Sequence, residues 1–321
     1  MGIPELNEST LEYPEHSIRG ILTGVVAYMK NFRNKAWVWG VAVFFMTVLP
    51  AGEGTAQEKV PFDAAFESLK EQLVKEGFDQ KKVIEIYQSP EVRFNVQGVS
   101  RFLTYREAKL NYDQFVSRRC IRQAKQYMEE YQGELKRAEQ AYGVDPKIVT
   151  AIILVETRLG TGTGNSSVIS TLSTIAALQD SRVRELFWKA VSEGNDITRE
   201  RFDGWVGRKS NWAYGELKAL LKYTEREKMD PAKLKGSFAG ALGISQFMPS
   251  NILAYAKDGD EDGRIDLFTH ADAIASVAHY LKRHGWRPGI DREKAFKVVW
   301  SYNHSDYYVD TILKISDKLE G

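Results

Sequence analysis

The chain has 321 residues, of which 43% are hydrophobic and 27% are charged. These proportions are typical of a globular protein and exclude a disordered, collagenous or polytopic membrane chain. Lys and Arg (44) nearly balance Asp and Glu (43), so we expect no nucleic-acid partner. The single cysteine, Cys120, excludes an intrachain disulfide framework and a multi-cysteine zinc site.

The first 56 residues are predicted to be a leader. Residues 36–49 form an apolar run that is shorter than a membrane span of about 20 residues and typical of a signal-peptide core. Basic residues precede this run, and a small-residue cleavage site ends at Ala56. We therefore interpret 29–56 as a signal peptide and 1–28 as sequence upstream of the true start; an uncleaved anchor is the alternative.

Export to the periplasm follows from this interpretation. Cleavage would leave a mature protein of residues 57–321 without a stable membrane span. The cleavage point has no neighbouring cysteine, so attachment as a lipoprotein is not expected. An exported protein with a single cysteine fits the bacterial periplasm.

The spacing of apolar residues predicts helices throughout the mature chain. Strand-like alternation is scarce, and the linkers are short and rich in glycine. The sequence therefore predicts one mainly α domain. The expected helices cover 61–75, a segment that begins at Asp79, 115–142, a segment that begins at Pro146, 167–179, 181–193, 214–229, 271–284, 291–302 and 306–319; the expected linkers are 160–164, 204–215, 236–243 and 257–264.

One acidic residue stands out at the end of an apolar helix. Residues 146–155 are apolar almost all round, which predicts a buried helix, and Glu156 follows them. The neighbouring Ile152 and Ile153 and the negative end of the helix dipole both disfavour the ionised carboxylate. Such an environment is typical of a general acid. The alternative is a helix-terminal glutamate that pairs with Arg158 or with another arginine.

Three sequence blocks resemble the membrane-bound lytic murein transglycosylase B family, the family 3 lytic transglycosylases. They are VETRLG at 155–160, GSFAGALGISQFMPS at 236–250, and SYNHS at 301–305 followed by Tyr307. The resemblance covers about residues 60 to 319. It implies an α+β, lysozyme-like catalytic core wrapped by helices, and an enzyme that acts on peptidoglycan glycan strands without a catalytic cofactor.

The resemblance also implies a role for each matching residue. Glu156 would be the single catalytic acid/base, and the substrate groove would be lined by Ser237, Gln246, Tyr302, Asn303 and Tyr307. Gln246 and Asn303 can equally be structural amides that cap loops. Cell-wall synthases are a candidate class of further partner, which the sequence itself does not reveal.

The implied reaction cleaves the β-1,4 bond between N-acetylmuramic acid (MurNAc) and N-acetylglucosamine (GlcNAc). No second carboxylate stands out in the motifs, which suits a route assisted by the substrate rather than a two-carboxylate hydrolysis. The resemblance implies internal attack by the muramyl C6 hydroxyl, which gives a 1,6-anhydro product. A hydrolytic muramidase on the same fold and a non-catalytic peptidoglycan-binding protein are the alternatives.

Residues 258–272 resemble an EF-hand calcium loop. Carboxylates stand at positions 1, 3 and 5, a glycine at 6 and a backbone carbonyl at 7. Position 12 is Thr269 rather than Glu, but the resembled family closes a longer loop with Asp at position 15. The expected ligands of a structural Ca²⁺ are Asp258, Asp260, Asp262, the backbone carbonyl of Arg264, and Asp272. The spacing also fits sodium or magnesium, and a solvated acidic turn is the alternative.

Overall fold

The computed structural model describes residues 64–104, 111–193 and 197–320. These residues belong to the second of two compact units, Glu58–Gly321. The predicted leader lies outside the described residues, so the boundary at 56/57 stays a prediction. Among the described residues, no helix is both long and apolar enough to cross a bilayer.

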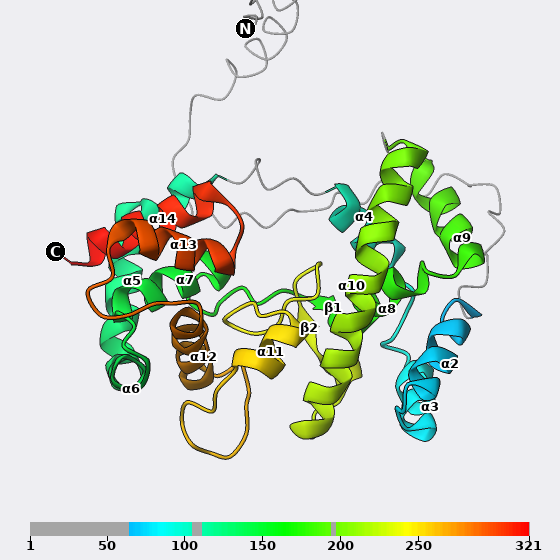
Figure 1. The fold of residues 1–321 in the computed structure, drawn as a ribbon, viewed down its shortest axis with the longest axis horizontal. Helices are drawn as coiled ribbons and strands as arrows, with labels where there is room; N and C mark the ends of the chain where they lie inside the picture. The colour runs from blue at the N-terminus through cyan, green and yellow to red at the C-terminus, as the bar shows by residue number, and fades with distance from the viewer. Residues whose placement is uncertain (1–63, 105–110, 194–196, 321) are drawn as a thin grey trace, which may run out of the picture. The chain divides into compact units, whose positions relative to one another are not determined.

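The described part of the chain is mostly helical, as the sequence predicts (Figure 1). Two short strands pair antiparallel, with Ser166 opposite Gly236. In chain order the elements are α2 (Glu67–Lys75), α3 (Gln80–Gln88), α4 (Val96–Thr104), η3 (Tyr112–Val116), α5 (Arg118–Glu130), α6 (Gln132–Tyr142), α7 (Pro146–Thr157), β1 (Ser166–Ser167), α8 (Val168–Ala177), α9 (Ser181–Ser192), α10 (Arg199–Arg226), η4 (Pro231–Lys233), β2 (Lys235–Gly236), α11 (Pro249–Tyr255), α12 (His270–Arg283), α13 (Arg292–Tyr302) and α14 (Asp306–Leu319).

Helix α7 is a core helix, as its apolar sequence predicts. Residues 148–154 are all buried, and α14, α5, α12 and α6 pack around the helix. Asp145 caps its N-terminus by accepting a hydrogen bond from the backbone N–H of Lys147 (2.9 Å). The helix is therefore held on several sides by neighbours, and the residues at its C-terminal end are presented from a rigid support.

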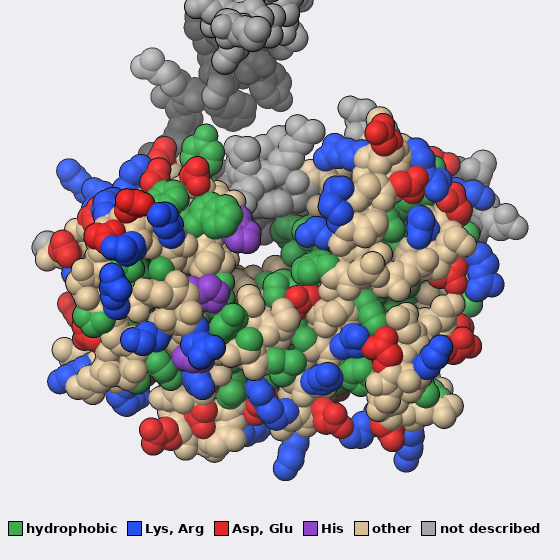
Figure 2. Space-filling model, viewed as in Figure 1, with side chains coloured by type: hydrophobic (Ala, Val, Ile, Leu, Met, Phe, Trp, Pro, Cys, Tyr) green, Lys and Arg blue, Asp and Glu red, His purple; other side chains and the backbone are tan. Residues whose placement is uncertain are grey.

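A second group of helices is built on α8 and α10. All residues of α8 are buried, and α8 packs along α10. Figure 1 shows β1, β2 and the connection 237–248 between this group and the helices around α7. The face seen in Figure 2 is hollowed near its centre, and hydrophobic side chains gather beside the hollow.

The predicted helix over 115–142 is in fact two helices. The helix is interrupted at Tyr131, between α5 and α6. The two halves have different partners, because α5 packs on α7 and α14 whereas α6 packs mainly on α12. The Tyr131 ring stacks on the ring of His270 (4.2 Å between centroids). The apolar spacing continues across the break, so the sequence pattern does not reveal it.

The predicted linker 204–215 is wrong, because α10 runs through it without interruption. Each glycine inside a helix costs about 1 kcal/mol relative to alanine. The same stretch buries Trp205, Val206 and Ala213, and full burial of each large apolar side chain is worth about 1.5–3 kcal/mol. Burial on α8 and its neighbours therefore outweighs the weak helix propensity of the glycines.

Candidate active site

Glu156 lies in the last turn of α7 and is half-buried. The helix ends because Arg158 (φ 50°) and Leu159 (φ 61°) both adopt the left-handed conformation. For residues other than glycine this conformation costs roughly 1–3 kcal/mol each and is concentrated at functional sites. The Arg158 guanidinium donates a hydrogen bond to Gln114 (2.5 Å) and lies over the ring of Phe115. The Arg158 side chain is therefore directed to η3.

One tyrosine hydroxyl contacts the Glu156 carboxyl group, and a second tyrosine lies nearby. The hydroxyl of Tyr308 donates a hydrogen bond to Glu156 Oε1 (2.7 Å). The ring of Tyr302 is nearly parallel to that of Tyr308 (7° between planes). Burial, and then the negative charge of Glu156, raise the pKa of both phenols well above the usual value of 10. Both phenols therefore stay protonated and remain hydrogen-bond donors at neutral pH.

Tyr308, and not the predicted groove residue Tyr307, contacts Glu156. The Tyr307 side chain is 71% exposed, whereas the next residue reaches Glu156. The SYNHS block resembles the family signature Tyr-Asn-x-Ser-x-x-Tyr, and a signature that begins at Tyr302 has its second tyrosine at position 308. The signature therefore indicates Tyr308 rather than Tyr307.

Gln246 is held in a tight turn by its own amide. Its Nε2 donates hydrogen bonds to the carbonyl oxygens of Thr163 (3.1 Å) and Gly243 (2.8 Å). Gly243 has φ 70°, and a Cβ atom there would lie 2.5 Å from the Leu267 carbonyl oxygen, so only glycine fits. The amide nitrogen caps the loop, which is the role that Gln246 has in the alternative interpretation as a structural amide. These bonds also fix the orientation of the whole side chain.

The turn that carries Gln246 is hydrogen-bonded to both of its neighbours. The Thr157 hydroxyl lies 3.0 Å from the carbonyl oxygen of Ile244, to which it donates. The backbone N–H of Ile244 donates to the carbonyl of Leu267 (2.8 Å). The end of α7, this turn and the acidic loop, which contains Leu267, are therefore hydrogen-bonded in series.

Ser237 and Asn303, the other predicted groove residues, are both half-buried. Ser237 Oγ accepts a hydrogen bond from the backbone N–H of Ala241 (3.0 Å), which closes the turn after β2. Asn303 follows the last residue of α13, and its carbonyl accepts from the N–H of Ser305 (2.8 Å). Tyr302 joins this region to the Gln246 turn, because its hydroxyl donates to the Ser245 carbonyl oxygen (2.6 Å).

Sequence reasoning missed Glu216, a buried residue of α10 that supports the same region. Its carboxylate accepts hydrogen bonds from the backbone N–H (2.8 Å) and the hydroxyl (2.7 Å) of Ser250. Helix α11 begins at Pro249, and its N-cap Met248 has no side chain that can accept a hydrogen bond from the helix. Glu216 therefore caps α11 from a neighbouring helix. The only signal in the sequence is an acidic residue between apolar positions of α10.

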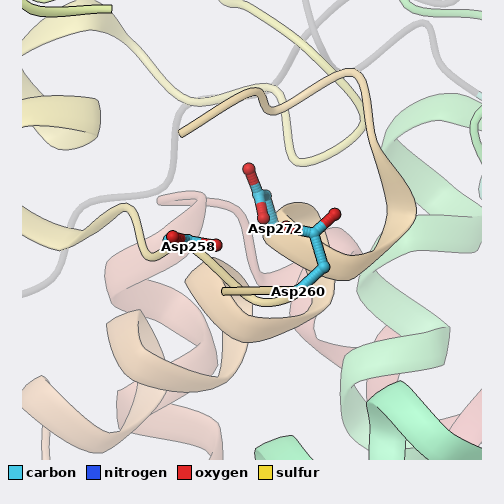
Figure 3. Close-up of side chains that lie close together, drawn as sticks. All are labelled: Asp258, Asp260 and Asp272. Carbon is cyan, nitrogen blue, oxygen red and sulfur yellow. The ribbon is translucent and has the colours of Figure 1, made fainter. Parts of the chain in front are cut away.

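The acidic loop brings three of its four predicted carboxylates together. Oxygen atoms of Asp258, Asp260 and Asp272 lie within 4.8 Å of one another. Figure 3 shows Asp258 and Asp260 on the loop and Asp272 at the start of α12. Burial, with a contribution from the other two carboxylates, raises the pKa of Asp272 to about 6. A set of oxygen ligands with mutual repulsion fits a hard divalent cation such as Ca²⁺.

Asp262, the fourth predicted carboxylate, is placed differently from the other three. The carboxylate of Asp262 accepts a hydrogen bond from the backbone N–H of Arg264 (2.8 Å), so it shapes the loop and is not in the cluster. The Asp272 carboxylate accepts from the N–H groups of Gly259 (2.7 Å) and Asp266 (2.6 Å). These bonds join position 15 of the loop to positions 2 and 9.

Comparison with known proteins gives matches over most of the described chain. Residues 61–293 match the family described as the transglycosylase SLT domain. The membrane-bound lytic murein transglycosylase B of Escherichia coli (strain K12) is 38% identical over 163 residues. That match spans 51% of this chain and 38% of the relative, so the chain covers well under half of the relative's length.

Solved structures of lytic transglycosylases have a similar fold. The E. coli lytic transglycosylase Slt35 in complex with calcium is 25% identical, with a TM-score of 0.62 over 80% of this chain and 92% of that one. SltB3 of Pseudomonas aeruginosa, in complex with NAG-anhNAM-pentapeptide, is 21% identical, with a TM-score of 0.63 over 81% of this chain and 80% of that one. At that identity SltB3 shows the fold alone. The family match covers more than half of the sequence, and the chain therefore belongs to the transglycosylase SLT domain family.

Proposed function

We propose that this protein is a lytic transglycosylase that cleaves the β-1,4 bond between MurNAc and GlcNAc in peptidoglycan and leaves 1,6-anhydromuramyl ends. The observation that carries the proposal is the half-buried Glu156, held by the Tyr308 hydroxyl at 2.7 Å, in a chain of this family. A carboxyl group oriented in this way can give a proton to a leaving oxygen and take one back.

The proposed reaction uses Glu156 twice. The protonated carboxyl group first gives its proton to the glycosidic oxygen, and the bond from that oxygen to C1 of MurNAc breaks. The resulting carboxylate then takes the proton of the muramyl C6 hydroxyl, whose oxygen forms the new bond to C1. Tyr308 keeps its own proton throughout, because its pKa is raised by burial and by Glu156. Its role is to orient the carboxyl group.

The composition of the proposed site supports internal attack rather than hydrolysis. Inverting and retaining glycosidases place a second carboxylate about 5–9.5 Å from the first. The proposed substrate-binding residues are instead hydroxyls and amides: Ser237, Gln246, Tyr302 and Asn303. These groups can hold an N-acetyl group but cannot act as a carboxylate nucleophile. Slt35 of E. coli, which is 25% identical, is a lytic transglycosylase, and this supports a transglycosylase reaction here.

We also propose a structural Ca²⁺ in the loop 258–272 and a periplasmic location. Asp258, Asp260 and Asp272 would hold the ion with the Arg264 carbonyl, and the ion would join the two ends of the loop. The complex of Slt35 with calcium supports this assignment. Peptidoglycan lies outside the cytoplasmic membrane, which supports the predicted export.

The mass of the products tests the proposed reaction. We expect the full chain, incubated with purified sacculi, to release muropeptides whose masses are one water below those of hydrolysis products. Mass spectrometry of the soluble fraction measures this difference directly. Products at the hydrolytic mass would show a muramidase, and binding to sacculi without release of fragments would show a non-catalytic protein.

Removal of the Tyr308 hydroxyl should slow the reaction. We expect Tyr308→Phe to lower the rate of muropeptide release about 10- to 100-fold, because a hydrogen bond to a charged group contributes about 1.5–3 kcal/mol. Tyr307→Phe is the matched comparison, since the same atom is removed one residue away from an exposed ring. A larger loss in Tyr307→Phe than in Tyr308→Phe would contradict the assignment.

A further inference from the structure

The C-terminal end of α10 binds the acidic loop at Ile265. The hydroxyl of Tyr223 donates a hydrogen bond to the Ile265 carbonyl oxygen (2.9 Å), and Glu227 Oε2 accepts from the Ile265 N–H (3.0 Å). The side chain of Arg264 donates to the Glu227 carbonyl oxygen (2.8 Å). Both Tyr223 and Glu227 are buried. Both backbone polar groups of Ile265 are therefore held by side chains of a helix about 40 residues away in sequence.

The bond to Glu227 determines the direction of a predicted calcium ligand. The N–H of Ile265 and the C=O of Arg264 belong to one planar trans peptide unit, so they point in opposite directions. Because Glu227 accepts the N–H, the Arg264 carbonyl must point away from Glu227. An anionic acceptor also polarises the peptide and increases the negative charge on that carbonyl oxygen.

Glu227 is itself held in place. The guanidinium of Arg226 donates to Glu227 Oε1 (2.6 Å), and only 6% of the Glu227 side chain is exposed. A buried carboxylate with a positive partner and a backbone donor has its charge compensated. Its geometry is therefore set by the end of α10 rather than by the loop that it contacts.

We infer that Glu227 is a positioning residue for calcium: it orients the Arg264 carbonyl, the ligand at position 7, toward the ion. The inference rests on the calcium site proposed above. Glu227, at the end of α10, would hold the peptide that carries this ligand by a hydrogen bond. Loss of such hydrogen-bond partners of metal ligands typically weakens metal binding 10- to 100-fold. Glu227 does not contact the ion itself.

Calcium titration of the full chain, freed of metal with a chelator, tests the inference. By calorimetry we expect Glu227→Leu to raise the Kd for Ca²⁺ about 10- to 100-fold. Glu227→Gln should raise it less, because the amide oxygen still accepts from Ile265. Glu216→Leu is the matched control: it removes another buried carboxylate from the same helix, where the partner is Ser250. It should lower the melting temperature but keep the wild-type Kd.

Three results would overturn the inference. The first is a wild-type Kd in Glu227→Leu, and the second is an equal rise of the Kd in Glu216→Leu, which would indicate general loosening of α10. The third is a wild-type chain that does not bind Ca²⁺, which would also remove the calcium site while leaving the product-mass test of the enzyme untouched.

A second pair of variants decides the question if Glu227→Leu does not fold. Tyr223→Phe removes only the hydroxyl that donates to Ile265 and should raise the Kd for Ca²⁺ about 2- to 10-fold. Tyr87→Phe is its control, because that buried hydroxyl contacts Ser173 (2.7 Å) and should leave the Kd unchanged. Equal Kd values in both variants and the wild type would overturn the inference.

Discussion

Glu156→Gln should abolish nearly all release of muropeptides while the protein stays folded. Glutamine has the same shape, and its amide oxygen can accept the hydrogen bond that Tyr308 donates to Glu156 (2.7 Å). It cannot give or take the proton that both halves of the proposed reaction require. We expect a loss of about 10²- to 10⁴-fold, the usual contribution of general acid–base catalysis.

Two measurements separate this loss from damage to the fold or to substrate binding. Co-sedimentation with sacculi should be as strong for Glu156→Gln as for the wild type, and the melting temperature should change little. Glu129→Gln, the same change at an exposed position of α5, should keep full activity. Release of fragments at the wild-type rate by Glu156→Gln would contradict the assignment of Glu156.

Calcium should raise the melting temperature, and a chelator should lower it. An ion that binds only the folded state stabilises it by mass action, by about 2.7 kcal/mol when its concentration is 100 times the Kd. In the structure the carboxylates of Asp258 and Asp260 contribute to the raised pKa of Asp272. The ion should remove this repulsion. Scanning calorimetry with calcium, magnesium and chelator measures the shift and its selectivity.

A double variant should separate repulsion from metal binding. Asp258→Asn combined with Asp260→Asn removes two of the three clustered charges but keeps oxygen atoms that accept from the loop backbone. We expect it to melt higher than the wild type in chelator and to lose the calcium-dependent shift. Glu261→Gln, an exposed change in the same loop, should keep the shift. A wild-type melting temperature that changes with neither calcium nor chelator would show that the loop is an ordinary acidic turn.

The sequence was most informative where local chemistry decides the structure. The Asp145–Pro146 start of α7 and its continuous apolar stretch predict a buried helix with Glu156 at its end, and the structure contains it. In the loop 258–272 the spacing of the carboxylates is set by the few turn residues between them. Such features depend on neighbours within a few positions, so they can be read along the chain.

The supporting residues of the site could not be predicted in this way. Glu216 reaches Ser250 and Glu227 reaches Ile265 only because α10 crosses segments 34 and 38 residues further along. No periodicity encodes those contacts. Likewise, the glycines of α10 indicate a linker locally, and burial against α8 reverses that indication. Tyr308 differs from these cases, because the Tyr-Asn-x-Ser-x-x-Tyr signature gives its position relative to Tyr302.

The burial of α7 has a consequence for the order in which the protein opens. Amide hydrogens of a helix enclosed on several sides exchange with solvent only through large unfolding events, whereas short bridges exchange through local opening. Glu156 lies at the end of such a helix. The Gln246 turn beside it buries Ile244 and Phe247, and it is hydrogen-bonded to Thr157 through Ile244 and to Tyr302 through Ser245. We expect deuterium exchange to be slow at both segments, so the carboxyl group and the turn next to it open together in one large unfolding event.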